Sequence, residues 1–201
     1  MKCRIVDYSK PSISHIKVKN NIKKIVSENN YSEDVSNIVL SLYNYMTEKK
    51  FFGGCHVFSS ILYVAFSEIG LETKIFVGEC QKKGERAFDH SWVTVDDKIV
   101  DLAIYYPLTE KINSMGGPIV LDVEATTLKM GEIAYGINTG LPLSSDTNIV
   151  INAKFDTYMS KFPHEINGLW TILKKIMPSG YDFNLDLLKE KYADTKRVFV
   201  R

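Results

Sequence analysis

The stretch CHVFSSILYVAFSEIG, residues 55–70, is apolar around most of its circumference when it is placed on a helix. A helix with this pattern is surrounded by protein rather than lying on a surface. Gly53 and Gly54 precede the stretch, and Gly70 ends it as a glycine at a C-terminal cap does. We therefore expect one buried central helix, around which the remaining elements pack.

Further helices are expected on both sides of this central helix. Apolar residues recur at helical spacing after Ser32, which is a typical N-cap residue, and continue to about residue 50. A weaker helical pattern covers about 14–28. Beyond the middle of the chain, helices are predicted over about 147–161, 165–177 and 184–193.

The segment between these helices has the patterns of an antiparallel sheet. LETKIFVG (71–78) alternates like a strand, ECQKKGERAFD (79–89) is predicted to be a loop, and HSWVTVDDKIVDLAI (90–104) predicts two strands joined at Asp96-Asp97. Residues 113–150 form a long connection, functional or partly structured, with a short strand at Ile119, Leu121 and Val123. Helices, strands and helices in this order indicate an α+β domain.

Charge and hydropathy argue against two classes of partner. The 201 residues carry a net charge of +1, which gives no electrostatic basis for binding nucleic acid or an anionic membrane. The start of the chain has no apolar signal-like region, and the longest apolar run, ILYVAF, is too short to span a bilayer. A cytoplasmic location is the expectation.

The cysteines indicate reduced thiols. An odd count of three, without a C-x-x-C pair, suggests neither a disulfide framework nor a structural zinc site. A zinc site remains an alternative because four residues have suitable ligand types: Cys55, His56, Cys80 and His90. No metal and no cofactor are expected. Apart from this zinc alternative, structural or surface roles are predicted for Cys3, Cys80, His15 and His164.

Three residues are candidates for nucleophilic catalysis. A thiol is mostly protonated at pH 7, so a catalytic cysteine needs a base, and the base needs an acceptor that fixes its tautomer. Cys55 would lie in the first turn of the central helix, where free backbone N–H groups favour a thiolate. With a two-residue turn at Asp96-Asp97, His90 and Asp101 share a sheet face as diagonal neighbours, with their Cβ atoms about 7 Å apart.

The pairing of His90 with Asp101 depends on this register, in which residue 95 pairs with 98. A three-residue turn would move Asp101 to the other face, and a turn at Asp97-Lys98 would set the pair too far apart. In the favoured register Trp92 lies beside both residues, where it would exclude water and strengthen the imidazole–carboxylate interaction. A buried thiol that only fills space remains the alternative for Cys55.

The order of these motifs resembles the core of the transglutaminase-like superfamily. The run GGCHVFS, then Gly70 followed by LETKIFV, then HSWV and a strand carrying an aspartate, covers residues 51–104, about a quarter of the chain. The resemblance implies a papain-like fold, with Cys55 as nucleophile, His90 as base and Asp101 as the residue that orients it. The single domain would span 1–201, with a catalytic core over about 32–110 and a helical extension over about 147–201.

Departures from the family pattern lie beside the cysteine. Gly54 replaces a frequent glutamine and His56 replaces a bulky aromatic residue, which disfavours a calcium-dependent cross-linking enzyme. Both residues are expected to line the site and to influence substrate preference. The backbone N–H of Cys55 is one expected oxyanion donor, and the preceding helix would supply a second from Asn44 or Tyr45.

The resemblance implies chemistry through a thioester. The leading expectation is a peptidase or amidase that acts on a peptide, a protein or a small amide. Acyl transfer to an amine, including from a protein glutamine, is an alternative for the same triad. A catalytically inactive binding module that keeps the fold is the alternative from another class.

Overall fold

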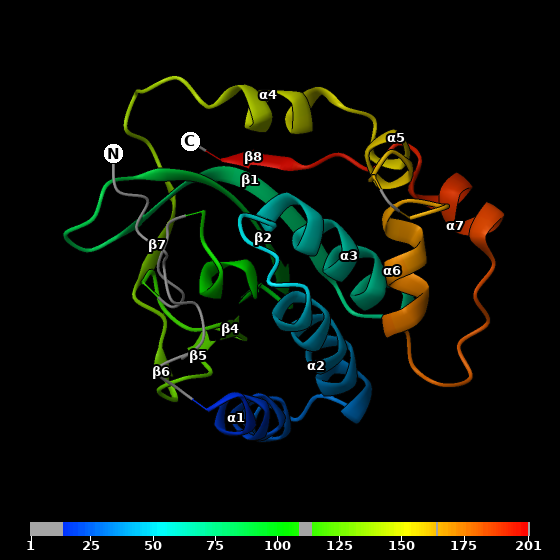
Figure 1. Ribbon diagram of the computed structural model, residues 1–201, viewed down its shortest axis with the longest axis horizontal. Coiled ribbons are helices and arrows are strands. Elements are labelled where there is room, and N and C mark those ends of the chain that lie inside the picture. Colours follow the sequence, from blue (N-terminus) through cyan, green and yellow to red (C-terminus); the bar gives the residue numbers. More distant parts are fainter. Residues whose placement is uncertain (1–13, 109–113, 164, 201) are drawn as a thin grey trace, which may run out of the picture.

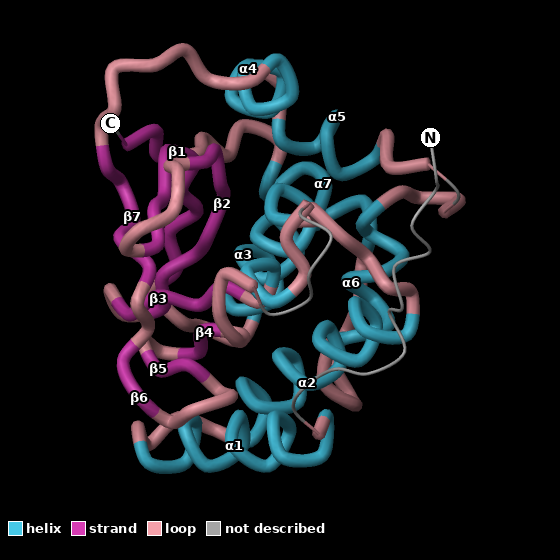
Figure 2. The backbone as a smooth tube through the Cα atoms, turned by 60° about the vertical axis from the view of Figure 1, so that its left-hand side comes forward, coloured by secondary structure: helices cyan, strands magenta, loops and turns pink. Residues whose placement is uncertain are grey.

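The computed structural model describes residues 14–108, 114–163 and 165–200, and these form an α+β fold. The strands gather on one side and most of the helices on the other (Figure 2). The predicted fold class is confirmed at this level.

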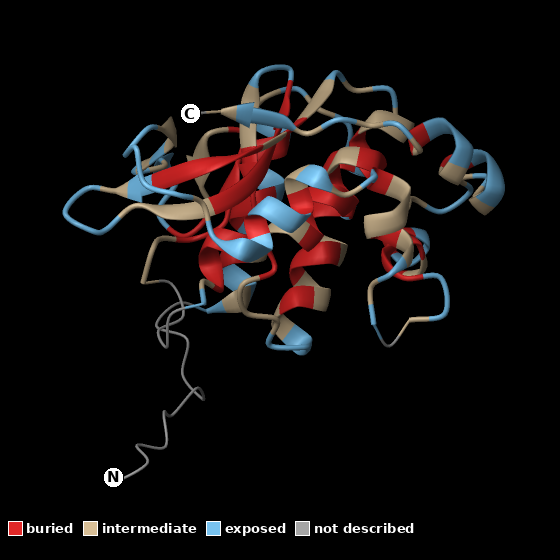
Figure 3. Cartoon of the chain, turned by 90° about the horizontal axis from the view of Figure 1, so that it is seen from above, coloured by how far each residue is buried: buried red, intermediate tan, exposed pale blue. Residues whose placement is uncertain are grey.

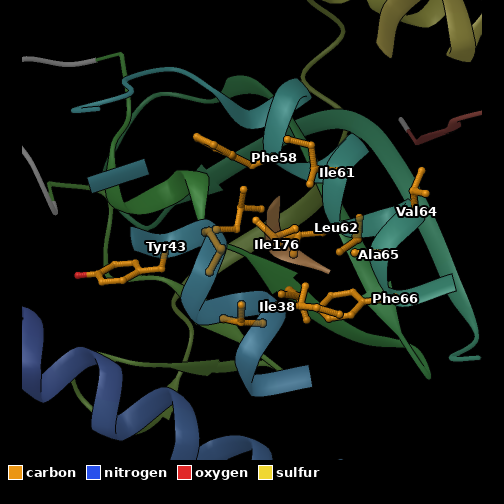
Figure 4. Close-up of a cluster of buried hydrophobic side chains, with 14 of the residues drawn as sticks. Ile38, Tyr43, Phe58, Ile61, Leu62, Val64, Ala65, Phe66 and Ile176 are labelled. Carbon is orange, nitrogen blue, oxygen red and sulfur yellow. The ribbon is translucent and has the colours of Figure 1, made fainter. Parts of the chain in front are cut away.

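Helix α3 (Cys55–Glu68) is the buried central helix that the sequence predicts. It packs against strands β1 and β2 on one side and against helices α2 and α6 on the other. Buried residues fill the interior where these elements meet (Figure 3). Figure 4 shows part of this core, with side chains from three helices: Ile38 of α2, Phe58, Ile61, Leu62, Ala65 and Phe66 of α3, and Ile176 of α6.

Helices α1 (His15–Glu28) and α2 (Glu33–Glu48) confirm the two helices predicted before the glycines. Ser32 is the N-cap residue of α2, and Glu33 and Asp34 in the first turn complement the positive end of the helix. The two helices pack against each other, and α1 crosses below the rest of the fold (Figure 1).

The strands form one sheet in the order β6-β5-β4-β3-β2-β1-β7. All neighbours along this order are antiparallel, whereas β8 pairs with β1 in parallel. The bounds are β1 (Thr73–Lys82), β2 (Phe88–Val95), β3 (Lys98–Asp101), β4 (Ile119–Val120), β5 (Val123–Glu124), β6 (Lys129–Met130), β7 (Ile133–Ile137) and β8 (Val198–Val200).

The hairpin of β2 and β3 has the predicted register. Val95 pairs with Lys98, and a two-residue turn joins them at Asp96 and Asp97. Both aspartates have positive φ, 48° and 62°, as the two central residues of a type I′ turn require. A type I′ turn matches the twist of the flanking strands. The strands therefore pair in the register that brings residue 90 toward residue 101.

The prediction of a loop over 79–89 is wrong at both ends, because the observed loop is shorter. β1 continues to Lys82 and β2 begins at Phe88, so only residues 83–87 connect them. The polar residues after Gly78 extend the strand because they pair with β7. Glu79 is buried there, and its carboxylate accepts a hydrogen bond from the backbone N–H of Thr139 at 3.0 Å.

Within the connection predicted over 113–150, the described residues 114–150 are largely structured. The single strand predicted at Ile119, Leu121 and Val123 is a tight hairpin of β4 and β5 instead. Leu121 and Asp122 form its turn with φ of 51° and 70°. Strands β6 and β7 follow, and α4 (Ser145–Asn152) ends the region.

The helix predicted over 147–161 is two helices, α4 and α5 (Phe155–Ser160), because the backbone is extended at Ala153. In an unbroken helix the Val150 carbonyl would accept from the N–H of Lys154. Instead, Arg197 Nη1 donates to this carbonyl at 3.2 Å, which satisfies it without the helix.

The helix predicted over 165–177 starts later, as α6 (Leu169–Ile176). Gly168 ends the preceding loop with φ of 58°, which favours glycine. A Cβ there would also lie only 2.2 Å from the Met159 carbonyl oxygen, so no other residue fits. Ile166 therefore lies before the helix, and it is exposed. The last predicted helix is confirmed as α7 (Leu185–Tyr192).

No helix in the described ranges is long and apolar enough to cross a membrane.

Candidate active site

Two glycines shape the turn that leads into Cys55, for different reasons. Gly53 has φ of 66°, and its N–H donates to the Tyr106 carbonyl at 2.9 Å. Gly54 has an ordinary negative φ, but a Cβ there would lie 2.5 Å from the Phe58 ring. Gly53 therefore provides the bend and Gly54 provides the space, and together they set Cys55 at the first position of α3.

The N-terminus of α3 surrounds Cys55 with backbone donors. The first bond into the helix runs from Phe58 N–H to the Gly54 carbonyl at 2.9 Å. The N–H groups of Cys55, His56 and Val57 precede this bond, so they have no acceptor one turn back in the helix. These groups and the positive helix end favour negative charge on the sulfur or on an oxygen bound beside it.

His90 and Asp101 form a buried pair. The Nε2 atom of His90 lies 2.7 Å from Oδ2 of Asp101, and the two residues are 5% and 2% exposed. The other carboxylate oxygen, Oδ1, accepts from the N–H groups of Ala103 at 3.0 Å and Ile104 at 3.3 Å. Asp101 occupies Nε2, so Nδ1 is the ring nitrogen that remains for the Cys55 side chain, which also acts on the charge of His90.

Opposing effects act on the charge of His90. Burial disfavours the imidazolium and by itself would lower the pKa of His90. The negative charge of Asp101, the Cys55 sulfur, and the hydrogen bonds to both overcome burial and raise this pKa to about 10. His90 is therefore an imidazolium at neutral pH, and it can stabilise a thiolate at Cys55.

Tyr135 of β7 is a member of the site that the sequence did not predict. Its hydroxyl donates to Asp101 Oδ2 at 2.9 Å, on the oxygen that also binds His90. Burial raises the pKa of Tyr135 well above its usual value, so the hydroxyl keeps its proton and remains a donor. The only signal in the sequence is the alternation of Ile133, Tyr135 and Ile137, hidden in a segment rich in turn residues.

Trp92, predicted to line the site, packs beside Tyr135 and is not among the residues that line the pocket next to Cys55. Its ring stacks on Phe76 with centroids 5.5 Å apart and an interplanar angle of 9°, and it packs against Tyr135 at 5.0 Å. Trp92 is 4% exposed. Aromatic rings thus cover one side of the His90–Asp101 pair and exclude water from it.

His56 joins three elements. Its Nδ1 atom lies 2.6 Å from Ser91 Oγ on β2, and its Nε2 atom lies 3.5 Å from Thr147 Oγ1 on α4. Burial, followed by the nearby charges of His90 and Arg197, lowers the pKa of His56 to about 4. It is neutral at pH 7, and both its ring nitrogens face hydroxyl groups.

Asn44 and Tyr45, the predicted sources of a second oxyanion donor, lie near the end of α2. The Asn44 carbonyl accepts from Thr47 Oγ1, and Tyr45 packs against the hydrophobic core. Within the described part of the chain, no hydrogen bond joins either residue to Cys55 or His90. The second donor stays a prediction.

A pocket of about 430 Å³ opens beside Cys55 and His90. Its walls come from the turn before α3, from the connection between β1 and β2, and from the segment after β3. The lining residues are Gly53, Cys55, Glu85, Arg86, Ala87, Phe88, Asp89, His90, Ala103, Pro107, Leu108 and Met115.

The other candidates lie apart from this arrangement or outside the described residues. His15 Nδ1 lies 2.7 Å from the Tyr43 hydroxyl, and Cys80 is buried, which raises the pKa of its thiol. Cys3 and His164 fall outside the described residues. In the ranges that are described, no three histidine, cysteine or acidic side chains gather to hold a metal ion, so the zinc alternative gains no geometric support.

Comparison of the chain with protein-family models, with curated proteins and with solved structures gives no match.

Proposed function

We propose that this protein is a thiol enzyme that breaks amide or peptide bonds through a thioester. The observation that carries the proposal is the buried Asp101–His90 pair beside Cys55, which begins a helix. The same three residues stand in the motif order of the transglutaminase-like superfamily. We therefore include in the proposal a papain-like core, with β1, β2 and β3 packed against α3.

The mechanism follows from the positions of the three side chains. The Cys55 thiolate attacks the substrate carbonyl carbon, and the backbone N–H groups at the start of α3 stabilise the oxygen as it becomes negative. His90 Nδ1 then donates its proton to the amine as the carbon–nitrogen bond breaks. The product is a thioester on Cys55, and water activated by His90 hydrolyses it to a carboxylic acid and the free thiol.

Asp101 acts through His90. Its carboxylate holds the imidazole with Nδ1 toward the sulfur and balances the imidazolium charge. This mechanism requires no cofactor. Transfer to an amine is the second candidate, because an amine that reaches the thioester before water would take the acyl group by the same steps.

Acetylation of Cys55 by p-nitrophenyl acetate tests the proposal. We expect one acetyl group, found on the peptide that contains Cys55, together with a burst of p-nitrophenolate equal to the enzyme concentration. A Cys55→Ala variant should lack both. Acetylation elsewhere in the chain at the same rate, with Cys55 unmodified, would contradict the proposal and favour an inactive binding module.

Decay of the acetyl-enzyme separates the two outcomes for the thioester. If the enzyme is a hydrolase, the acetyl group should leave Cys55 in buffer alone. If it is an acyltransferase, the acetyl-enzyme should persist until a primary amine is added.

A further inference from the structure

The pocket beside the proposed nucleophile has apolar walls. Cys55 and His90 are among its lining residues, so a group that fills the pocket lies next to the proposed reacting atoms. Its volume of about 430 Å³ is within the range of small-ligand sites and holds far more than a methyl group. Six apolar residues form most of the surface: Ala87, Phe88, Ala103, Pro107, Leu108 and Met115.

Two of these walls are tied to the catalytic residues. The Phe88 ring meets the His90 ring edge to face, with centroids 5.5 Å apart at 75°. The N–H of Ala103 donates to Asp101, which fixes the position of the Ala103 side chain. The pocket is therefore preformed where substrate must bind, and no rearrangement of the triad is needed to open it.

Leu108 contributes an exposed apolar surface at this pocket. It is 85% exposed, and it packs over Gly53, where a Cβ would lie 2.4 Å from its Cδ2 atom. A ligand that covers this leucine removes apolar surface from water, which favours binding.

The charged residues of the lining do not offer a buried polar site. Glu85 and Arg86 are exposed, and the Asp89 carboxylate accepts a hydrogen bond from the Ser144 N–H at 2.5 Å. A polar side chain that entered the pocket would lose water and gain few partners.

We propose, on the basis of the proposed function, that this pocket binds the apolar side chain of the residue that supplies the acyl group. The acyl group is the part of the substrate that becomes bonded to Cys55, and Cys55 and Gly53 form part of the wall. The amine departs after the first step, whereas the acyl group stays beside the pocket until the thioester breaks. Peptides with a leucine-like residue before the scissile bond are the preferred substrates.

Three p-nitrophenyl esters test this preference: those of N-acetylglycine, N-acetylleucine and N-acetylglutamine. They share one leaving group, so differences in kcat/KM report the acyl side. Burial of a leucine side chain predicts at least about tenfold preference for the leucyl over the glycyl ester. The glutaminyl ester, similar in length but polar, should react at least about tenfold more slowly than the leucyl ester.

Variants of two exposed leucines link the preference to the pocket. Leu108→Asp places a charge at the pocket, and we expect the ratio of leucyl to glycyl kcat/KM to fall about tenfold. Leu187→Asp makes the same change on α7, which does not line the pocket, and should keep the ratio.

The outcomes distinguish this inference from the function on which it rests. Acylation of Cys55 by all three esters at similar rates, or fastest by the glutaminyl ester, overturns the apolar pocket and leaves the thiol mechanism standing. Failure of every ester to acylate Cys55 overturns both.

Discussion

Replacement of His90 by alanine is expected to lower the rate of Cys55 acylation about 1,000-fold. In the proposed mechanism His90 is the base that supports the Cys55 thiolate, and such a group contributes about 10²–10⁴ to the rate. The rate of p-nitrophenolate release from the N-acetylleucyl ester measures the effect. Circular dichroism of the variant verifies that the loss does not come from unfolding.

His15→Ala is the matched control for this variant. Like His90, His15 has one ring nitrogen on an oxygen, here the Tyr43 hydroxyl, but it lies on α1 and does not line the pocket. Its removal should leave the acylation rate within about twofold. A folded His90→Ala protein that reacts as fast as the His15→Ala protein would exclude His90 from the chemistry.

Replacement of Asp101 by alanine is expected to destabilise the fold by about 3–5 kcal/mol. The carboxylate is 2% exposed and accepts hydrogen bonds from four groups, so its loss leaves a buried histidine and three donors without their acceptor. Urea denaturation at pH 7 measures the difference in free energy of unfolding. Tyr135→Phe removes one of the four hydrogen bonds and should cost about 1 kcal/mol.

The stability difference between wild type and Asp101→Ala also depends on pH. The pKa of His90 rises from the ordinary 6.5 to about 10 in the folded protein. Because the folded protein binds this proton more tightly than the unfolded chain, protonated His90 adds to the free energy of unfolding. The addition is complete below pH 6.5 and is lost as the pH rises through about 10. The difference should therefore narrow between pH 7 and pH 10.5. A difference below about 1 kcal/mol at pH 7 would show that Asp101 is not an important structural anchor for His90.

Local patterns predicted the elements that hold the candidate site. The apolar circumference of residues 55–68 is sufficient for a buried helix, and Asp96-Asp97 is sufficient for a two-residue turn. The turn determines which residues pair across β2 and β3, and it therefore brings His90 to Asp101. Each of these features depends on residues close in sequence, so it is visible without a structure.

Features that depend on distant partners were not predictable. Glu79 lies within a strand because its backbone pairs with β7 and its carboxylate accepts a hydrogen bond from Thr139, 60 residues away. Arg197 donates to the Val150 carbonyl in place of the backbone N–H that a continuous helix would supply. No residue near 150 in the sequence indicates this contact. Tyr135 reaches Asp101 only because β7 pairs with β1. β8, three residues long and parallel to β1, was missed for the same reason.

The reason for Gly54 also became clear only in three dimensions. The sequence shows a glycine beside the cysteine, and we expected it to influence substrate preference. Its Cβ position is filled by the rings of Phe51 and Phe58, so its absence of a side chain is required by packing behind the turn. Gly53 is the glycine of this turn that lines the pocket, together with Leu108, which packs over it from the segment after β3.

The rate of Cys55 alkylation at pH 7, with and without His90, tests the central claim most directly. Peptide mapping after brief treatment with iodoacetamide reports each of the three cysteines separately, and the buried Cys80 should remain unmodified. We expect Cys55 to be alkylated much faster in the wild-type protein than in His90→Ala, because the raised pKa of His90 keeps an imidazolium beside the sulfur and thiolate is the form that reacts. Equal alkylation rates in the two proteins would contradict the thiolate–imidazolium pair and with it the proposed enzyme.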